Sequence, residues 1–444
     1  MKYHFIGIKG SGMSALAQIL CDLGLYVQGS DVDHHLYSED LLRSKNIPIY
    51  SFDSNNINIG LTIIVGNAFD ESNVELKKAK ELNLNIYKYT EMLGELVKKY
   101  KTLSICGTHG KTTTTSMISY IMNNTIGVNY LIGDGTGFAN KNNEIFIMEA
   151  CEFKRNFLHY YPKDIILTNI DMDHLDYFKD LDDIKDAFKE FIGHAENTLI
   201  ACGDDLNVRS IINREVIYYG FNSNNDVVIE NMILDETGSS FDLYYNRDYL
   251  DTFKINLYGS HMVLNAAAAI IYCYINDIPI EDIKRYINEF KGAKRRFKET
   301  IVNNTILIDD YAHHPTEIKT AILSAKQKYP NKKIVSVFFE NTFSRTQKLY
   351  KEYANSLKLS DIVFVTDILS DREKKEDYNG VGPQLILDLL KEGYYLNIDN
   401  FLDNNNLNIV KPLLNYKNDV IIFMGCKEVY YLKDKLEVLL KEEI

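Results

Sequence analysis

The sequence predicts an α/β protein built from three domains. Short apolar runs that are typical of buried strands alternate with helix-compatible segments along the chain, which is the pattern of doubly wound sheets. At 444 residues the chain is long enough for about three domains of ordinary size. Polar stretches at residues 98–101 and 294–296 interrupt the alternation. We therefore expect Rossmann-like domains at 1–98 and 298–444, and a central phosphate-loop ATPase domain at 99–297.

The composition is that of a soluble globular chain, with 45% hydrophobic and 25% charged residues. A formal charge of −13 argues against general affinity for nucleic acid or an anionic membrane surface. The 6 cysteines are scattered and favour free thiols in a reducing compartment. The N-terminal residues have no signal-peptide pattern, and no apolar run approaches the roughly 20 residues that span a bilayer. We expect a cytoplasmic protein without nucleic-acid or membrane partners.

In the first domain, a glycine turn follows the first strand. Gly7, Gly10 and Gly12 are offset from the usual dinucleotide fingerprint, so they favour a diphosphate at a helix N-terminus rather than NAD in particular. Asp31, at the end of the second strand, is either a ribose-binding carboxylate or an ordinary polar strand end. Strands are expected at residues 4–8, 26–31 and 62–68, and a helix at 15–23.

The central domain begins with a phosphate-binding pattern. An apolar strand at residues 103–106 runs into the turn 107–110, and Lys111 and Thr112 then open a helix-compatible run. Backbone N–H groups and the helix dipole favour an anion there, Lys supplies a positive charge, and Thr is a ligand for Mg²⁺. The glycines are two residues closer than in the generic motif. This spacing predicts a nucleotide site or, as the plain alternative, a strand–turn–helix connection.

Reactive side chains follow other strands of the same domain. Glu149 ends the strand at 145–149, and Asp171, Asp173 and His174 follow the strand at 164–171. Because open α/β sheets bind ligands at these strand ends, a carboxylate beside the phosphate loop suits Mg²⁺ on nucleotide phosphates. Further expected elements are a strand at 197–202, an antiparallel insert at 226–258 and helices at 261–275 and 279–290.

The third domain repeats the α/β pattern. Asp310 ends its first strand and is a candidate for ribose hydroxyls, while His313 or His314 is a candidate for a phosphate. Arg296 lies at the hinge before this domain, and Arg345 is a candidate for a carboxylate. Strands are expected at residues 305–310, 333–339, 361–367 and 419–425.

Taken together, the motifs resemble those of the Mur ligase family, in family order and over nearly the whole chain. They are FIGIKGSGMS (5–14), GSD (29–31), GTHGKTTTT (107–115), EACE (149–152), TNIDMDHLDYF (168–178), GSHMVLNAAAA (259–269), RRF (295–297), DDYAHHPTE (309–317) and TFSRT (342–346). The members most similar in these motifs join L-alanine to UDP-N-acetylmuramate. The resemblance implies domains for the UDP-sugar, ATP and the amino acid, and phosphorylation of the muramate carboxylate by ATP followed by amide formation.

The resemblance also implies roles for individual residues. ATP and Mg²⁺ are the implied cofactors, UDP-N-acetylmuramate and L-alanine the implied substrates, and the chain is expected to be a monomer or weak homodimer. Lys111, Glu149, His174 and His109 are the implied catalytic set, with Thr112, Glu149 and His174 on the metal and His109 a candidate neighbour of the muramate carboxylate. The residues implied to bind the nucleotide are Gly107, Thr108, His109, Gly110, Lys111, Thr112, Thr113, His261, Asn265, Arg296 and Asp310. The residues implied to bind the substrates are Gly10, Ser11, Gly12, Ser30, Asp31, His313 and Arg345.

The chain departs from the family pattern mainly where the amino acid is expected to bind. Phe339, Glu340 and Asn341 replace Gln, Pro and His before the third-domain helix. Gly425-Cys426-Lys427 replaces a GAG motif, and Met262 replaces an Asn of the nucleotide helix. Related ligases carry a carbamylated lysine at the metal. Lys189 lies near that point in the sequence, but the helical register favours Phe188 there, so we expect no carbamate.

These departures leave alternatives beside L-alanine ligation. One is a ligase of the same family for another amino acid or for a murein peptide. The other is a nucleotide- or UDP-sugar-binding protein with reduced catalysis.

Overall fold

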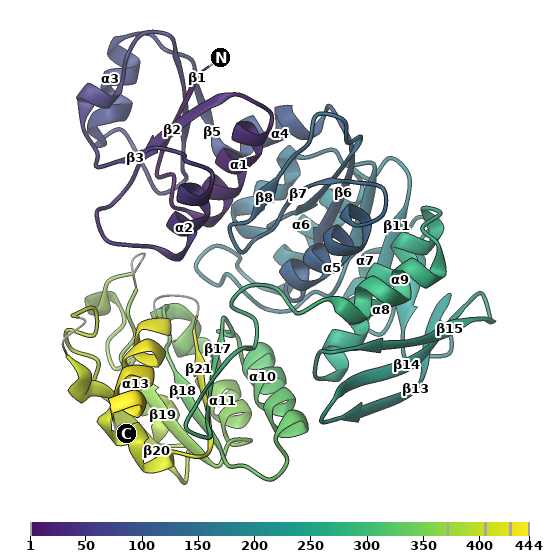
Figure 1. Cartoon of the computed structure of the whole chain (residues 1–444), viewed down its shortest axis with the longest axis vertical. Coiled ribbons are helices and arrows are strands. Elements are labelled where there is room, and N and C mark those ends of the chain that lie inside the picture. Colours follow the sequence, from purple (N-terminus) through teal and green to yellow (C-terminus); the bar gives the residue numbers. More distant parts are fainter. Residues whose placement is uncertain (1, 371–372, 404–405, 426–428, 443–444) are drawn as a thin grey trace.

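The computed structural model consists of three α/β bodies, each built around its own sheet (Figure 1). It describes residues 2–370, 373–403, 406–425 and 429–442. The strands of the three sheets come from separate stretches of chain. The strands of the first sheet end at Lys88, those of the second begin at Lys101, and those of the third begin at Lys298. The domain limits at 98 and 297 remain a prediction, but no sheet crosses them. Across the described ranges, no helix is long and apolar enough to span a membrane.

The N-terminal sheet has five parallel strands in the order β3-β2-β1-β4-β5. The first expected strand lies two residues earlier than predicted, because the positive φ of 85° at Gly7 ends it. Its elements are β1 (Lys2–Ile6), α1 (Ser11–Asp22), β2 (Tyr26–Ser30), α2 (Tyr37–Ser44), β3 (Ile49–Tyr50), β4 (Leu61–Val65), α3 (Val74–Glu81), β5 (Ile86–Lys88) and α4 (Tyr89–Val97).

The central sheet has ten strands, in the order β15-β14-β13-β12-β11-β10-β6-β9-β7-β8. Its strands are β6 (Lys101–Cys106), β7 (Asn129–Leu131), β8 (Gly137–Phe138), β9 (Ile145–Glu149), β10 (Asp164–Leu167), β11 (Leu199–Cys202), β12 (Ile217–Gly220), β13 (Val227–Asp235), β14 (Gly238–Tyr245) and β15 (Asp248–Ile255). Its helices are α5 (Lys111–Asn123), α6 (Leu181–Ile192), α7 (Leu206–Ile211), α8 (Ser260–Ile275) and α9 (Ile280–Glu289).

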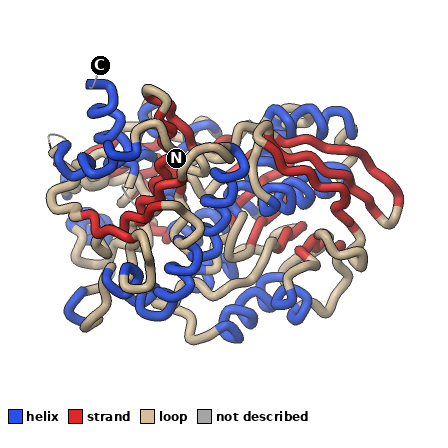
Figure 2. The backbone as a smooth tube through the Cα atoms, turned by 90° about the horizontal axis from the view of Figure 1, so that it is seen from below, coloured by secondary structure: helices blue, strands red, loops and turns tan. Residues whose placement is uncertain are grey.

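The expected antiparallel insert is confirmed. Strands β13 to β15 pair antiparallel, and β13 joins them to β12, so the insert lengthens the central sheet rather than forming a separate one. Figure 2 shows these long strands at one end of the molecule.

The C-terminal sheet has six strands, β16-β17-β21-β18-β19-β20, and β16 alone among the described strands of this sheet pairs antiparallel. Its elements are β16 (Lys298–Val302), β17 (Thr305–Asp310), α10 (Pro315–Lys328), β18 (Ile334–Phe338), α11 (Phe343–Leu357), β19 (Ile362–Thr366), α12 (Gln384–Leu387), β20 (Gly393–Leu396), β21 (Val420–Met424) and α13 (Tyr430–Glu442). Short 3₁₀ segments in the chain lie at Ser54–Asn56, Phe153–His159, Lys375–Asp377 and Leu407–Tyr416.

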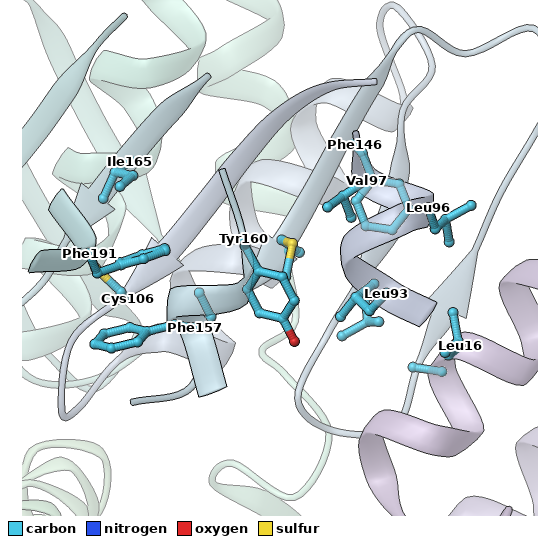
Figure 3. Packing of buried hydrophobic residues seen from close by; sticks show 14 of the residues in the cluster. Leu16, Leu93, Leu96, Val97, Cys106, Phe146, Phe157, Tyr160, Ile165 and Phe191 are labelled. Carbon is cyan, nitrogen blue, oxygen red and sulfur yellow. The ribbon is translucent and has the colours of Figure 1, made fainter. Parts of the chain in front are cut away.

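The first two bodies share one continuous apolar core. Leu16 of α1 and Leu93 and Leu96 of α4 are buried in the same cluster as Phe146 of β9 (Figure 3). The C-terminal body has cores of its own on the two faces of its sheet. This arrangement leaves the ends of β6, β9 and β10 facing the C-terminal body.

Candidate functional site

The phosphate-binding turn has the predicted local structure. Strand β6 ends at Cys106, and α5 begins at Lys111 directly after Gly110. Gly110 has a φ of 82°, and a Cβ there would lie 2.6 Å from Asn265 Oδ1, so this position requires glycine twice over. The free N–H groups at the start of α5 therefore face a space that only a side-chain-free turn leaves open.

The ammonium of Lys111 is held inside the site by its own loop and by Glu152. Its Nζ donates to the Thr108 carbonyl at 3.0 Å and lies 3.0 Å from Glu152 Oε2. Burial disfavours the charge, but Glu152, Cys151 and Glu149 together outweigh this effect, and the pKa of Lys111 is raised above its ordinary value. Glu152, the last residue of the EACE motif, is a partner that the sequence reasoning missed.

Two of the three predicted metal ligands lie in direct contact. Thr112 Oγ1 donates to Glu149 Oε2 at 2.8 Å, and the Gly133 N–H donates to the same oxygen at 3.1 Å. Burial raises the pKa of the Glu149 carboxyl, which nearby Lys111 offsets only in part. A hydroxyl and a carboxylate that lacks a full cationic partner fit Mg²⁺, which takes oxygen ligands and keeps several waters.

The third predicted ligand, His174, lines the same cavity as Thr112 and Glu149 but lies against Glu152. Its Nε2 is 3.7 Å from Glu152 Oε1, and its ring contacts Phe153 with centroids 4.8 Å apart. Its backbone has a positive φ of 53°. Lys189 lies on the exposed face of α6 and Phe188 in the core, as the helical register predicts.

A cavity of about 450 Å³ lies where all three bodies meet. The N-terminal body contributes Gly10 and Ser11, and the C-terminal body contributes His313. The remaining lining includes Lys9, Tyr37, Thr108, Gly110, Lys111, Thr112, Glu149, Cys151, Asp173, His174, Arg295, Arg296, Tyr311 and Glu317. Lys9, Tyr37 and Tyr311 were missed, because which side chains face a cavity between three bodies depends on packing that the residues nearby do not reveal.

Three predicted UDP-sugar residues do not line this cavity. The Ser30 hydroxyl donates to Glu75 in the interior of the first body. Both Asp31 oxygens accept backbone N–H groups, from Lys9 at 2.6 Å and Val32 at 2.8 Å, and burial raises the pKa of this carboxyl. Gly12 lies under the Tyr89 ring, where a Cβ would be 2.7 Å from the phenol oxygen. These contacts hold Asp31 and Gly12 at the turn and Ser30 in the interior, and binding of the UDP-sugar by these residues stays a prediction.

A larger cavity of about 1320 Å³ separates the central and C-terminal bodies. The predicted nucleotide residues that line it are His109, Gly110, Thr112, Thr113, His261, Asn265, Arg296 and Asp310. Burial, with a smaller contribution from Arg296, lowers the pKa of His261 to about 4, so its ring is neutral at pH 7. This neutral ring and the Asn265 amide can hydrogen-bond an uncharged base.

Asp310 also lines the larger cavity, but both of its carboxylate oxygens already accept backbone hydrogen bonds. Oδ2 accepts the Phe297 N–H and Oδ1 the Ala312 N–H, both at 2.8 Å. Burial raises the pKa of this carboxyl to about 6. The geometry indicates that Asp310 organises the hinge before β16, while its predicted contact with ribose stays a prediction.

His109 lines the larger cavity and is absent from the lining of the smaller one, and its expected place beside the muramate carboxylate stays a prediction. Its ring faces the larger cavity, with Nε2 3.3 Å from Asp171 Oδ2 and Nδ1 3.4 Å from Glu317 Oε1. Burial lowers the pKa of His109, but these two carboxylates more than compensate and raise it to about 9. The structure thus places His109 at the seam between the second and third bodies.

Family models match this arrangement body by body. The models described as "Mur ligase family, catalytic domain", "Mur ligase middle domain" and "Mur ligase, glutamate ligase domain" match residues 2–101, 105–273 and 295–426. The chain belongs to the Mur ligase family. Mur ligases are ATP-dependent, and the family makes peptidoglycan precursors.

Solved structures with the same fold include three different Mur-type ligases. UDP-N-acetylmuramate–alanine ligase MurC from Thermotoga maritima is 24% identical with a TM-score of 0.82, and all of both chains is covered. A murein peptide ligase from Psychrobacter arcticus is 23% identical with a TM-score of 0.71, covering 99% of this chain and 98% of that one. MurF from Thermotoga maritima in complex with ADP is 17% identical with a TM-score of 0.63, covering 94% and 96%. At these identities the likeness shows a shared fold.

The region expected to depart from the family pattern surrounds Arg345. This buried guanidinium contacts Asp173 through Nε at 3.2 Å and Nη2 at 3.1 Å, and its Nη1 lies 3.2 Å from Asn341 Oδ1 and 3.4 Å from Glu340 Oε1. Burial raises the pKa of Asp173, but Arg345 and the nearby His174, His313 and His314 together outweigh it and hold that pKa well below its usual range. Arg345 therefore bridges two bodies and does not line either cavity.

The other departures are less informative. Phe339 is fully buried after β18, and Met262 is partly buried on α8. Cys426 and Lys427 lie outside the described residues, and a Cβ at Gly425 would lie 2.7 Å from the Phe339 carbonyl. His313, predicted to meet a substrate, lines the smaller cavity with its Nδ1 against the Tyr311 carbonyl at 2.9 Å.

Proposed function

We propose that this Mur ligase joins L-alanine to the carboxylate of UDP-N-acetylmuramate, with ATP as the phosphate donor. The observation that carries the proposal is the 450 Å³ cavity, which the glycine turn of the first body, the phosphate loop of the second and His313 of the third line together. A reaction that joins three substrates needs one space that all three binding regions reach. The fold likeness to an alanine-adding ligase and the family's ATP dependence support the same assignment.

In this proposal the phosphate loop binds the nucleotide and Lys111 moves from Glu152 to the transferred phosphate. The muramate carboxylate attacks the γ-phosphorus, ADP leaves, and the acyl phosphate forms. Thr112 and Glu149, with His174 nearby, would hold Mg²⁺, which supplies charge neutralisation between nucleotide phosphates when bound. Glu152 also contacts His174, so one buried carboxylate positions both Lys111 and His174.

The amine of the amino acid then attacks the acyl carbon, and inorganic phosphate leaves with formation of the amide. The nitrogen loses a proton in this step. A closed site matters because water would hydrolyse the acyl phosphate. The Asp173–Arg345 bridge brings the third body over the cavity, which supports a role for that body in excluding water.

A second candidate is ligation of a different amino acid or of a peptide. Arg345, the expected partner of the amino-acid carboxylate, is already neutralised by Asp173 and Glu340. This arrangement therefore suits an acceptor whose carboxylate does not need Arg345 as its binding partner.

The test is phosphate release from ATP by the full chain with UDP-N-acetylmuramate and a panel of amino acids and murein peptides. L-alanine should give the highest kcat/KM. Preference for another acceptor would support the second candidate. No amide product at ordinary enzymatic rates, about 1 per second, would leave a binding protein with reduced catalysis.

Lys111→Ala is the sharpest variant for the chemical step. Loss of its charge should lower kcat by about a thousandfold, roughly 4 kcal/mol of transition-state stabilisation. Lys101→Ala, an exposed lysine paired with Glu144, is the matched control and should keep full activity. Unchanged turnover of the Lys111 variant would remove this residue from the mechanism.

A further inference from the structure

Two imidazoles and one carboxylate converge at the seam between the central and C-terminal bodies. His109 comes from the phosphate loop, Asp171 from the segment after β10, and His314 from the residue before α10. His109 Nε2 lies 3.3 Å and His314 Nδ1 3.8 Å from the same oxygen, Asp171 Oδ2, and the three ligand atoms lie within 4.8 Å of one another. Thr112 and Glu149, proposed for Mg²⁺, are not members of this group.

The second nitrogen of each ring is already held by an acceptor. His109 Nδ1 lies 3.4 Å from Glu317 Oε1, and His314 Nε2 lies 3.0 Å from the Met172 carbonyl oxygen. Metal-bound histidines usually donate their other N–H in this way, because the contact sets the tautomer and aims the free lone pair. In that tautomer, His314 Nδ1 presents its lone pair toward Asp171, and a bound ion would replace the proton that His109 Nε2 shares with the same carboxylate.

The spacing suits a small transition-metal ion. Tetrahedral ligands at the usual zinc distances of roughly 2.1 Å lie about 3.4 Å apart, close to the separations at Asp171 Oδ2. The competing contacts are modest. The Thr316 N–H donates to His314 Nδ1 at a long 3.3 Å, Thr316 Oγ1 donates to Asp171 Oδ2 at 2.9 Å, and the Met172 N–H donates to Asp171 Oδ1 at 2.8 Å.

We propose that His109 Nε2, Asp171 Oδ2 and His314 Nδ1 form a binding site for a zinc-class transition-metal ion that ties the central body to the C-terminal body. Nitrogen ligands favour such ions over Mg²⁺, which prefers oxygen. His109 and Asp171 also line the 1320 Å³ cavity, which gives the ion a path in and leaves its fourth position for water or a phosphate oxygen.

A metal ion bound at this site would hold the central and C-terminal bodies together. The ligands come from two bodies, so a bound ion stabilises only the state in which both are together. Release of products from between the bodies requires them to separate, and micromolar Zn²⁺ should therefore slow turnover. The binding itself does not depend on which amino acid the enzyme uses.

The test uses Co²⁺ as a spectroscopic probe of the full-length chain, freed of metal and without nucleotide or substrate. Visible d–d absorption bands of a nitrogen- and oxygen-bound, four-coordinate Co²⁺ should appear at one ion per chain and disappear when Zn²⁺ is added. His314→Gln and Asp171→Asn should each weaken Co²⁺ binding at least tenfold. Zn²⁺ should also raise the melting temperature of the wild type.

Two matched controls make the result specific. Glu149→Gln removes the proposed Mg²⁺ carboxylate, and His194→Ala removes an imidazole that stacks on Tyr161 elsewhere in the central body. Both should keep the bands. The proposal is overturned by the absence of bands and of a Zn²⁺-dependent melting shift, by bands that survive both seam variants, or by thiolate charge-transfer bands that vanish on cysteine alkylation. Since no substrate is present, these outcomes are independent of the ligase assay.

Discussion

The two seams of this molecule are held together by different kinds of contact. Between the first and second bodies, Leu16, Leu93 and Leu96 are buried in one apolar cluster with Phe146 (Figure 3). Between the second and third bodies lie ion pairs such as Asp173–Arg345 and a cavity of about 1320 Å³. Smaller polar contacts add to this second seam, including Gln327 Nε2 donating to the Gly238 carbonyl at 2.8 Å.

The difference indicates which body moves. Apolar burial is non-directional and is lost only when the surfaces separate into water, so the first seam behaves as part of a core. Hydrogen bonds and ion pairs exchange readily for contacts with water or ligand, and their net stabilisation is small. We therefore expect the first two bodies to act as one rigid unit and the third to open and close over the nucleotide.

The largest effect is expected from Arg345→Ala, which breaks the second seam. Asp173 and Glu340 would then stay buried without the guanidinium that both contact. Removal of one partner from a buried pair costs about 3–5 kcal/mol. Small-angle scattering should show a larger radius of gyration, and the urea midpoint of the third body should fall.

The matched control for this variant is Arg285→Ala, an exposed arginine paired with Glu289 on α9. Its cost should be below about 1 kcal/mol. A compact, fully stable Arg345→Ala protein would show that the ion pair does not hold the second seam.

The next effect is expected at the first seam from Leu93→Ala. This side chain is 1% exposed, and loss of its methyl groups leaves a cavity that costs about 3 kcal/mol. The urea midpoint of the first and second bodies should fall together, with no change in the radius of gyration before unfolding. Leu206→Ala, 80% exposed on α7, should shift the midpoint by less than about 0.5 kcal/mol. Separate transitions for the two bodies would contradict the single rigid unit.

The smallest effect concerns pH at the hinge before β16, which belongs to the second seam. Asp310 has a folded pKa of about 6 against an ordinary 3.8, so the folded state holds its proton more tightly than the unfolded state. The stabilisation is complete below the ordinary value and is lost as the pH rises through 6, by up to about 3 kcal/mol. Asp310→Asn, which does not titrate, should lack this loss.

The measurement is the difference in free energy of unfolding between wild type and Asp310→Asn from pH 4 to 7. It should shift in favour of the variant as the pH rises. A constant difference would show that the carboxyl titrates normally in the folded protein.

Local structure was predictable to a large extent. The phosphate loop, the alternating elements and the antiparallel insert follow from short-range patterns, and the structure reproduces them with small shifts. The strand expected at residues 4–8 lies at Lys2–Ile6, because Gly7 turns the chain earlier than hydrophobicity alone suggests. Motifs in family order also identified the family, which the family models match over most of the chain.

The partners of the site residues were less predictable. Ser30 and Asp31 were expected at the UDP-sugar, but their side chains bond to Glu75 and to the turn at Lys9. His109 was expected beside the muramate carboxylate, and its ring lies between Asp171 and Glu317. Each of these contacts depends on how a strand end is oriented against distant chain, and that orientation leaves no pattern in the residues nearby.

By itself, the sequence determined the strand, the glycine turn and the helix start around Lys111, because these residues are adjacent and the backbone geometry is local. Tertiary structure alone decided that Glu149 lies against Thr112 and that Arg345 lies against Asp173, which is 172 positions away. The physical reason is that charge partners across a seam are chosen by the packing of whole bodies. The same packing brings His109, Asp171 and His314 to one point.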